Sequence, residues 1–583
     1  MPRRHLVKPC LQCRSRKVLC DRRPGRCANC ERLHHRCSFE TAADETQDRP
    51  PERRRGVRAC VACQHNKERC SGESPDCRSC RQRGRLCRYP ERRPARQSPP
   101  VSGGGSYRTI KQLAGRSLTL TRVDLLSLLD HYFLHLYPLP SYSFLHEASV
   151  RRMVATEAII EPSLVLAMAA VAGLLCRSSP LAVDERTRCV EHAEQRLWAH
   201  LDTPSFFRLQ ALLLLVQYHA QVGNFARAFM MIAVVSRMAA ALRLTYEQPD
   251  LDPIVQEMRR RALWTVVLLD GHFSAGLPGY DTIHLDAIYV QFPSTEEVFA
   301  RGKASGNPTW PHPSLLALIL SLSRTRRDIM RFTRQLVLVE EPWPQLHAVV
   351  GEFQNTLAQL QTDMTAAGSS RLPPPSERWF VRHLDIHLAW HHAHCDLYRL
   401  FLRGCADAAP EVVLDALEPS LVAHAHQTCD EHSAWMATAL AGLSSSAAGS
   451  DRVLPLGAAV CAFQAARLVL FLPTFQAPGY HNRCRADEAL RRAKSFLSFL
   501  QVSFGASAPT RDMVSHLERL VALYDVDNPS VDPDMPQSSS SSSSSSSNLA
   551  TERHGRLAIH SLIHQAKFVD DSHLYQGYLN NDS

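Results

Sequence analysis

Residues 8–40 read KPCLQCRSRKVLCDRRPGRCANCERLHHRCSFE, and residues 58–90 read RACVACQHNKERCSGESPDCRSCRQRGRLCRYP. Each segment places six cysteines at the spacing C-x2-C-x6-C-x6-C-x2-C-x6-C, and the second set begins fifty residues after the first. Structural zinc takes four ligands in a tetrahedron. Six thiolates can therefore serve two zinc ions only if two of them bridge both metals. The spacing predicts a binuclear zinc–thiolate cluster in each segment, with the ligands Cys10, Cys13, Cys20, Cys27, Cys30, Cys37, Cys60, Cys63, Cys70, Cys77, Cys80 and Cys87.

Other kinds of cysteine chemistry fit this pattern less well. A disulfide framework needs an oxidising compartment, usually reached through a signal peptide, and the N-terminal MPRRHLVKPC is basic and has no apolar core. A four-cysteine zinc site would use only the two C-x2-C pairs and would leave Cys20 and Cys37 without a role, like Cys70 and Cys87 in the second copy. RING and LIM modules need eight ligands and do not fit the spacing. Seven further cysteines are scattered and are expected to be ordinary thiols of a reducing compartment: Cys176, Cys189, Cys395, Cys405, Cys429, Cys461 and Cys484.

Positive charge is concentrated at the start of the chain. Residues 1–100 contain 26 Lys and Arg against 11 Asp and Glu, whereas the remainder contains 41 basic and 46 acidic residues. A basic head on a slightly acidic body is the electrostatic footprint of nucleic-acid binding. The clusters contain almost no aromatic side chains on which single-stranded RNA bases could stack, so RNA is the less favoured partner. Double-stranded DNA is the predicted partner.

Both cysteine-rich segments resemble the DNA-binding domain of fungal zinc-cluster transcription factors. Each keeps a basic stretch between the second and third cysteines and a proline before the fourth, Pro24 and Pro75. The resemblance implies two Zn²⁺ ions in each cluster, four in the chain, and a nuclear regulator of transcription by RNA polymerase II. It also implies that the first and fourth cysteines bridge the metals, which makes the bridging ligands Cys10, Cys27, Cys60 and Cys77.

The first copy has the stronger surface for DNA. Between its second and third cysteines stand Arg14, Arg16 and Lys17, with no acid. From first to last cysteine this copy has eight basic and two acidic residues, and the second copy has six and three. The resemblance implies that Arg16 and Lys17 face the bases of a CGG-type half-site, where they can donate to guanine, and that Arg14 and Arg22 touch phosphates.

The second copy keeps the same cysteine scaffold with a diluted contact surface. Lys67 keeps the lysine of the family and Arg69 adds a second basic residue, but Glu68 lies between them. Asn66 stands where the family has a basic residue, a departure that counts against guanine preference in this copy. We expect the second copy to contribute mainly to affinity, orientation or half-site spacing.

Two arrangements on DNA remain open. The 22-residue linker 38–59 is rich in Asp, Glu, Arg and Pro, and as a flexible coil its ends would lie roughly 25–30 Å apart. One turn of DNA spans about 34 Å, so both clusters could engage one duplex. Residues 91–121 show no sustained apolar heptad of the kind that forms the dimerising coiled coil of most relatives. A tandem-cluster monomer and a homodimer are both compatible with the sequence.

The middle of the chain is predicted to form one large all-α domain. Apolar residues recur at helical spacing in RVDLLSLLDHYFLHLYP, EHAEQRLWAHL, FFRLQALLLLVQYHAQ and FARAFMMIAVVSRMAAALRL. The apolar stretch from Leu164 to Cys176 is too short to cross a bilayer, so a buried helix and no membrane contact are expected. HYFLHLYPLPSYSFLHE (131–147) and EMRRRALWTVVLLDGHFSAGLP (257–278) resemble the fungal-specific transcription factor domain. The second segment keeps the family residues Arg259, Arg260, Arg261, Trp264, Asp270, Ser274, Gly276 and Pro278.

No enzyme motif is found. Gly103–Gly105 lie in a polar linker, and RGKAS at 301–305 lacks the first glycine of a phosphate-binding loop. The best candidate for a further metal site is a row of residues at helical spacing, beside Asp385. Its expected role is a polar stripe on an amphipathic helix, satisfied by solvent and neighbours, with zinc binding as the alternative. The row consists of His383, His387, His391, His394 and Cys395.

The predicted organisation runs from two small, metal-stabilised modules to a helical body and a tail. Beyond the serine run, AKFVDDSHLYQGYLNND mixes acids with large apolar residues, as an activation segment does, although an unstructured terminus with incidental aromatics is equally compatible. The boundaries are 8–40 for the first cluster domain, 41–57 for a linker, 58–90 for the second cluster domain, 91–120 for a disordered basic linker rich in Pro, Gly and Ser, 121–526 for the all-α regulatory domain, and 527–583 for a disordered tail with the serine run 538–547.

The function predicted from these observations is sequence-specific DNA binding at CGG-like half-sites by a nuclear transcription factor. Its expected targets are a metabolic or secondary-metabolite gene set, which it would regulate, and its expected partners are DNA and the transcription machinery or co-regulators. The alternative is a helical ligand-sensing or enzymatic protein that carries zinc clusters as structural appendages.

Overall fold

A computed structural model divides the chain into two units, residues 1–105 and residues 106–583. The linkers, the serine run and the acidic tail considered above lie outside the residues that it describes. The described residues are 13, 20–21, 23, 26–32, 37, 60–66, 68, 70–71, 76–87, 121–156, 161–176, 179, 181–274, 281–302, 312–337, 339, 341, 343–405, 408–446, 452–477, 481–482, 484–505 and 507–525.

All regular structure in these residues is helical, as the sequence predicts. Among its described residues, the first unit has the short helices α2 (Ala28–Arg32), α3 (Val61–His65) and α4 (Arg78–Gln82). The second unit has the helices α6 (Arg122–His131), α7 (Glu147–Ala155), α8 (Pro162–Leu175), α9 (Val183–Trp198), α10 (Phe206–Gln221), α11 (Phe225–Ala241), α12 (Pro253–Ser274), α13 (Glu296–Arg301), α14 (Leu315–Val337), α15 (Leu346–Ala366), α16 (Phe380–Tyr398), α17 (Glu411–Leu414), α18 (Pro419–Ser446), α19 (Leu456–Phe471), α20 (Ala486–Phe504) and α21 (Arg511–Tyr524).

Local sequence signals set the beginnings of several of these helices. Thr121 caps α6: its hydroxyl accepts the Asp124 N–H at 3.2 Å, and the Asp124 carboxylate accepts the Thr121 N–H at 2.8 Å. This reciprocal pair satisfies two backbone donors that the first turn of a helix leaves unpaired. Pro162 opens α8 and Pro253 opens α12, positions where the missing proline N–H costs no helical hydrogen bond.

One predicted helix differs from the regular form. The segment RVDLLSLLDHYFLHLYP begins as α6 and then widens into a π-helical turn, η2 (Tyr132–Leu136). The N–H of Tyr137 donates to the carbonyl of Tyr132, five residues back, at 2.8 Å. Pro138 cannot continue the ladder, and a short 3₁₀ turn, η3 (Pro140–Tyr142), follows.

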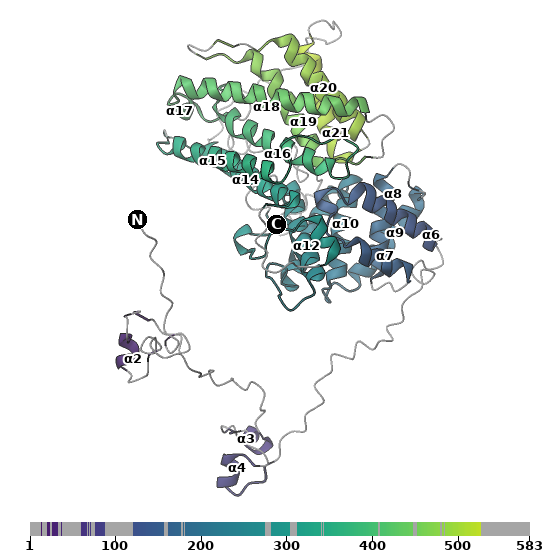
Figure 1. The fold of residues 1–583 in the computed structure, drawn as a ribbon, viewed down its shortest axis with the longest axis vertical. Helices are drawn as coiled ribbons and strands as arrows, with labels where there is room; N and C mark the ends of the chain where they lie inside the picture. Colours follow the sequence, from purple (N-terminus) through teal and green to yellow (C-terminus); the bar gives the residue numbers. More distant parts are fainter. Residues whose placement is uncertain are drawn as a thin grey trace, which may run out of the picture. The chain divides into compact units, whose positions relative to one another are not determined.

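The helices of the second unit enclose one continuous apolar core. Figure 1 shows α6 to α12 grouped together and α14 to α21 stacked in a second group. The packing runs from α8 against α9 and α10, through α12 against α14, to α16 against α14, α18 and α19. Helix α8 is buried along almost its whole length, which confirms the prediction of a buried helix for Leu164–Cys176.

Helix α19, extended to Thr474, is long and apolar enough to cross a bilayer, but 72% of its apolar window is buried inside the domain. It packs against α18 and α20. Its apolar character is therefore accounted for by its place in the core.

The two sequence segments that resemble the fungal-specific domain meet in a buried ion-pair network. Arg261 on α12 is fully buried, with its guanidinium 2.9 Å from the Glu257 carboxylate and 2.8 Å from that of Glu296 on α13. Arg382 on α16 lies 2.5 Å from the same Glu296 and donates to the Pro138 carbonyl at 2.9 Å. Burial would raise the pKa of Glu296, but Arg382 and Arg261 lower it to about 2.

Other polar residues of α12 bind neighbouring segments of the chain. Arg259 donates to the Leu242 carbonyl at 2.8 Å, at the end of α11, and Asp270 accepts the N–H and the hydroxyl of Thr282. Arg260 lies 2.7 Å from Glu247. The arginine-rich motif is therefore a structural feature of the helical domain. Gly276 and Pro278, from the same motif, lie outside the described residues.

Candidate metal centres and nucleic-acid interface

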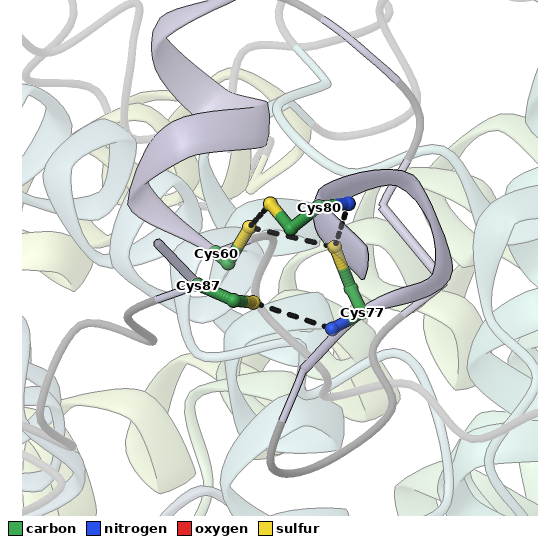
Figure 2. Close-up of side chains that lie close together, drawn as sticks. All are labelled: Cys60, Cys77, Cys80 and Cys87. Carbon is green, nitrogen blue, oxygen red and sulfur yellow. Dashed lines mark hydrogen bonds between the residues drawn. The ribbon is translucent and has the colours of Figure 1, made fainter. Parts of the chain in front are cut away.

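The second cysteine cluster is built on two short helices whose sulfur atoms converge. Cys60 immediately precedes α3 and Cys63 lies on it, while Cys77 caps α4 and Cys80 lies on it. The Cys60 Sγ lies 3.7 Å from the Cys77 Sγ and 3.6 Å from the Cys80 Sγ, and Figure 2 shows these side chains turned toward one another with Cys87 beside them. The sulfurs are too far apart for disulfide bonds, and every cysteine that the structure describes is free of one.

Each half of this cluster has the same backbone hydrogen bonds. The Cys63 N–H donates to the Cys60 Sγ at 3.4 Å, and the Cys80 N–H donates to the Cys77 Sγ at 3.4 Å. The N–H groups of Cys60 and Cys77 in turn donate to the third cysteine of their own half, Cys70 at 3.4 Å and Cys87 at 3.3 Å. The six-cysteine pattern is therefore two copies of C-x2-C-x6-C, and Cys60 and Cys77 occupy equivalent places in them.

The sulfur atoms form two groups of four that have two members in common. One group consists of Cys60, Cys63, Cys70 and Cys77, and the other of Cys60, Cys77, Cys80 and Cys87, with all sulfurs of a group within 4.8 Å of one another. Four sulfurs around a zinc ion at about 2.3 Å would lie about 3.8 Å apart. The Sγ–Sγ distances of Cys60–Cys77, Cys60–Cys80 and Cys63–Cys77, each within one of these groups, are 3.6 to 3.7 Å and match that tetrahedral edge.

The protonation chemistry of the sulfurs also suits a divalent cation. Desolvation raises the pKa of Cys63 and, more strongly, that of Cys80, so neither thiol readily ionises by itself. The backbone N–H of Cys80 lowers the pKa of Cys77 to about 6. A bound divalent cation removes the remaining cost of ionisation because a coordinating thiol is deprotonated outright. The residues present therefore fit zinc.

The first cluster shows the same arrangement in the residues that are described. Cys13, Cys27 and Cys30 are buried with their sulfurs within 4.8 Å of one another, and the Cys13 and Cys27 sulfurs lie 3.5 Å apart. The Cys27 N–H donates to the Cys37 Sγ at 3.5 Å, as Cys77 does to Cys87. Cys20 packs against this group. Cys10, the sixth predicted ligand, lies outside the described residues.

The predicted DNA contacts remain predictions. The side chains of Arg14, Arg16, Lys17, Arg22, Lys67 and Arg69 all lie outside the described residues. Asn66, which stands in a slot that is basic in the first copy, is described: its side-chain amide donates to the Ala62 carbonyl at 2.9 Å, at the end of α3. The side-chain amide of Asn66 is therefore hydrogen-bonded to the backbone of its own module.

Glu68 adds a second difference between the copies: besides offsetting the neighbouring positive charge, it forms contacts within the module. Its carboxylate forms ion pairs with Arg83 and, at 3.6 Å, with Arg85, and it accepts the Ser79 hydroxyl at 3.2 Å. The corresponding residue of the first copy, fifty positions earlier, is Val18. Two of the basic residues of the second copy are therefore held by an internal acid.

The histidine row on α16 is not a solvent-facing stripe. His391 stacks on Trp435 of α18 with ring centroids 4.0 Å apart, and its Nδ1 lies 2.9 Å from the His432 Nδ1. His394 stacks on His432 at 4.2 Å, and His387 stacks on Trp435 at 5.4 Å. The row lies at the interface of α16 and α18, because Trp435 and His432 of α18 cover it.

The remaining members of the row, His383 and Cys395, also have contacts within the domain. His383 lies 2.9 Å from the Ser369 hydroxyl, and Cys395 is fully buried in the core. Within the described part of the chain, the groups of His, Cys, Asp and Glu close enough to hold a metal ion are those of the two N-terminal clusters, one of which includes Asp21.

Comparisons with known proteins agree with this geometry. Residues 8–46 and 58–96 each match the fungal Zn(2)-Cys(6) binuclear cluster domain, and residues 129–336 match the fungal specific transcription factor domain. Domains of the first kind bind two Zn²⁺ ions each, so the two clusters hold four. No curated protein and no solved structure matches the chain. Two cysteine clusters of this geometry, followed by the matched helical domain, identify the chain as a fungal zinc-cluster transcription factor, a DNA-binding regulator of transcription.

Proposed function

We propose that the chain binds CGG-like half-sites in double-stranded DNA through its zinc clusters and regulates a metabolic or secondary-metabolite gene set in the nucleus. The observation that carries this proposal is the pair of four-sulfur groups that share Cys60 and Cys77. In the proposed sites these two residues bridge the metals of the second cluster, and Cys10 and Cys27 bridge those of the first. The other eight cysteines of the two segments each bind one zinc ion.

The two clusters have different tasks in this proposal. Arg16 and Lys17 of the first cluster donate to guanine, while Arg14 and Arg22 contact phosphates. In the second cluster, Lys67 and Arg69 provide positive charge for the backbone of the DNA. The ion pairs of Glu68 with Arg83 and Arg85 support this division because they reduce the free positive charge of the second module. The contact of Asn66 with the Ala62 carbonyl supports it as well, because it engages the side-chain amide within the module.

Both clusters of one chain engage the same duplex in the proposed complex. The reach of the 22-residue linker, roughly 25–30 Å, is close to one turn of DNA at about 34 Å. A homodimer is the alternative, and the mass of the complex with a DNA duplex distinguishes the two. The proposal includes the domain boundaries predicted from the sequence. It also includes contacts of the acidic tail with the transcription machinery.

The rival interpretation was a ligand-sensing or enzymatic protein with structural clusters. Its enzymatic form is excluded, because both matched domains are those of transcription factors. Its ligand-sensing form is compatible with DNA binding.

The test compares equivalent lysines of the two clusters. Lys17→Ala should weaken binding of the full chain to a CGG duplex by about 1–3 kcal/mol while leaving binding to a scrambled duplex nearly unchanged. Lys67→Ala should weaken binding to both duplexes to a similar, smaller extent. The measurement is fluorescence anisotropy at one fixed salt concentration. If Lys17→Ala leaves the preference for CGG intact, the assigned role of the first cluster is wrong.

A further inference from the structure

The helical domain contains a cavity that neither the DNA-binding function nor the matched domains explain. Its volume is ≈ 620 Å³, within the range of pockets that bind small molecules. It lies among α10, α12, α14, α16 and α19, and apolar residues such as Phe273, Ile319 and Val460 form most of its wall. A packed protein interior has few voids larger than a water molecule, so a space of this size is a candidate binding site.

The α14 side of the cavity carries excess positive charge. Arg326 and Arg327 both line it; Arg327 is paired with Asp281, so the excess charge lies at Arg326. Asp396, fully buried behind this wall, is shared between Arg326, whose Nε lies 2.7 Å from it, and Arg399, whose Nη2 lies 2.9 Å from it. One carboxylate therefore faces two guanidinium groups.

Neighbouring groups do not cancel the charge of Arg326. A quarter of its side chain is accessible, and its Nη2 has no hydrogen-bond partner in the described part of the chain. His392, which contacts Asp396 at 3.4 Å, stays neutral because burial lowers its pKa to about 3. A buried charge without full compensation is costly, and an anion in the cavity would lower that cost.

The α16 side offers a second polar group. Asp385, Ala389 and His392 line the cavity at helical spacing on one face of α16. Asp385 forms no hydrogen bond or ion pair with any described residue, and desolvation raises its pKa to about 7. Near neutral pH its carboxyl group can therefore accept a hydrogen bond or donate one to a polar group of an occupant.

We propose that this cavity binds a small, largely apolar molecule with one anionic group, and that the anionic group pairs with Arg326. The apolar wall contacts the body of the molecule, and Asp385 contacts a second polar group on it. Such a site makes the helical domain a sensor of an amphipathic organic acid. The inference depends on the helical domain alone and is independent of which DNA site the clusters recognise.

Two fluorescent probes with a similar aromatic skeleton test the proposal. 1-Anilinonaphthalene-8-sulfonate carries one negative charge, and N-phenyl-1-naphthylamine carries none. The full chain should bind one molecule of the anionic probe in the cavity. Arg326→Gln should weaken this binding roughly 10- to 100-fold, since a hydrogen bond to a charged group is lost, and should change binding of the neutral probe less than about twofold. Arg331→Gln is the matched control, because Arg331 lies on the same helix, is 42% exposed and does not line the cavity.

A cavity-filling variant makes the test independent of charge. Ala389→Phe should abolish binding of both probes, whereas Ala358→Phe, at an exposed position of α15, should leave both unchanged. Thermal melting of each variant, followed by circular dichroism, separates loss of binding from loss of folding. Equal binding of the anionic probe by wild type, Arg326→Gln and Ala389→Phe in their folded states would overturn the proposal, as would stronger binding of the neutral probe.

Discussion

The sulfur atoms of Cys60 and Cys77 lie 3.7 Å apart, and these two residues belong to both four-sulfur groups of the second cluster. They occupy equivalent places in the two halves of the module, each receiving a backbone N–H from the cysteine three residues later. A change at either residue therefore removes a sulfur from both groups, whereas a change at Cys70 or Cys87 removes one from a single group.

The zinc content of the chain should show the effect of removing a shared sulfur. Cys77→Ser should reduce the zinc bound by the full chain from four ions to two, because both ions of the second cluster lose a ligand and zinc-binding energy is folding energy in so small a module. The measurement is elemental analysis of the purified chain. Cys484→Ser, at a half-buried thiol far along the chain, should retain four ions. A Cys77→Ser chain that still held four ions would contradict the assignment of Cys77 as a bridging ligand.

Glu68 should restrain the binding of the second cluster to DNA. Glu68→Val places the residue of the first copy in the second and releases Arg83 and Arg85 from their ion pairs. We expect tighter binding to a duplex of random sequence and a steeper dependence on salt, by about 0.9 in log–log slope for each new phosphate contact. Anisotropy titrations at several salt concentrations measure the slope. Glu352→Val, at an exposed position of α15, is the control, and a Glu68→Val slope equal to that of the control would refute the expectation.

Glu296 should be important for the stability of the helical domain. Glu296→Gln leaves Arg261 and Arg382 buried without their common carboxylate and should lower the free energy of unfolding by about 3–5 kcal/mol. Denaturant titration followed by far-ultraviolet circular dichroism measures the change. Glu297→Gln, one residue later and exposed, should change it by less than about 0.5 kcal/mol. Equal stability of the two variants would show that the network contributes little.

Acid should destabilise the helical domain through the interface of α16 and α18. Burial lowers the pKa of His391 to about 2, that of His394 to about 3 and that of His432 to about 4, from an ordinary value of 6.5. Below pH 6.5 these histidines bind protons in the unfolded chain but stay neutral in the folded domain. The free energy of unfolding therefore falls as the pH is lowered from 6.5 toward 4. Asp385, with its raised pKa, acts in the opposite direction between pH 3.8 and 7, but it is one group against three.

Melting temperatures at pH 7.0 and 5.0 test this expectation. Wild type should melt several degrees lower at pH 5.0. His391→Asn removes one of the histidines and should reduce the difference, whereas His347→Asn, at an exposed position, should not. If His391→Asn shows the same difference in melting temperature between pH 7.0 and 5.0 as wild type, other groups control the response to acid.

The sequence predicts those parts of the structure that depend on chain-local patterns. The cysteine spacing predicts which residues form each cluster, because the coordination number of zinc determines how many ligands are needed. Helical periodicity gives α9, α10 and α11, because a buried face repeats every three to four residues. The π-helical turn at Tyr132 is not visible in such a pattern, since it depends on the chain entering the Pro138 turn.

Contacts between distant residues could not be predicted in this way. Glu296 meets Arg382 across 86 residues, and Arg326 meets Asp396 across 70. Nothing in the local sequence of either residue indicates its partner. The histidine row illustrates the same limit: its spacing identifies one helical face, but only the packing of α18 against that face shows that Trp435 and His432 cover it.

The most direct measurement is an anisotropy titration of the full chain against a duplex with CGG half-sites and against one of the same composition with those triplets scrambled. Each titration is performed with zinc present and after treatment with a chelator. If the clusters are zinc-organised DNA-binding modules, the chain binds the CGG duplex more tightly, and chelation abolishes the preference. Binding that shows no preference for CGG, or a preference that survives complete removal of zinc, would contradict the account.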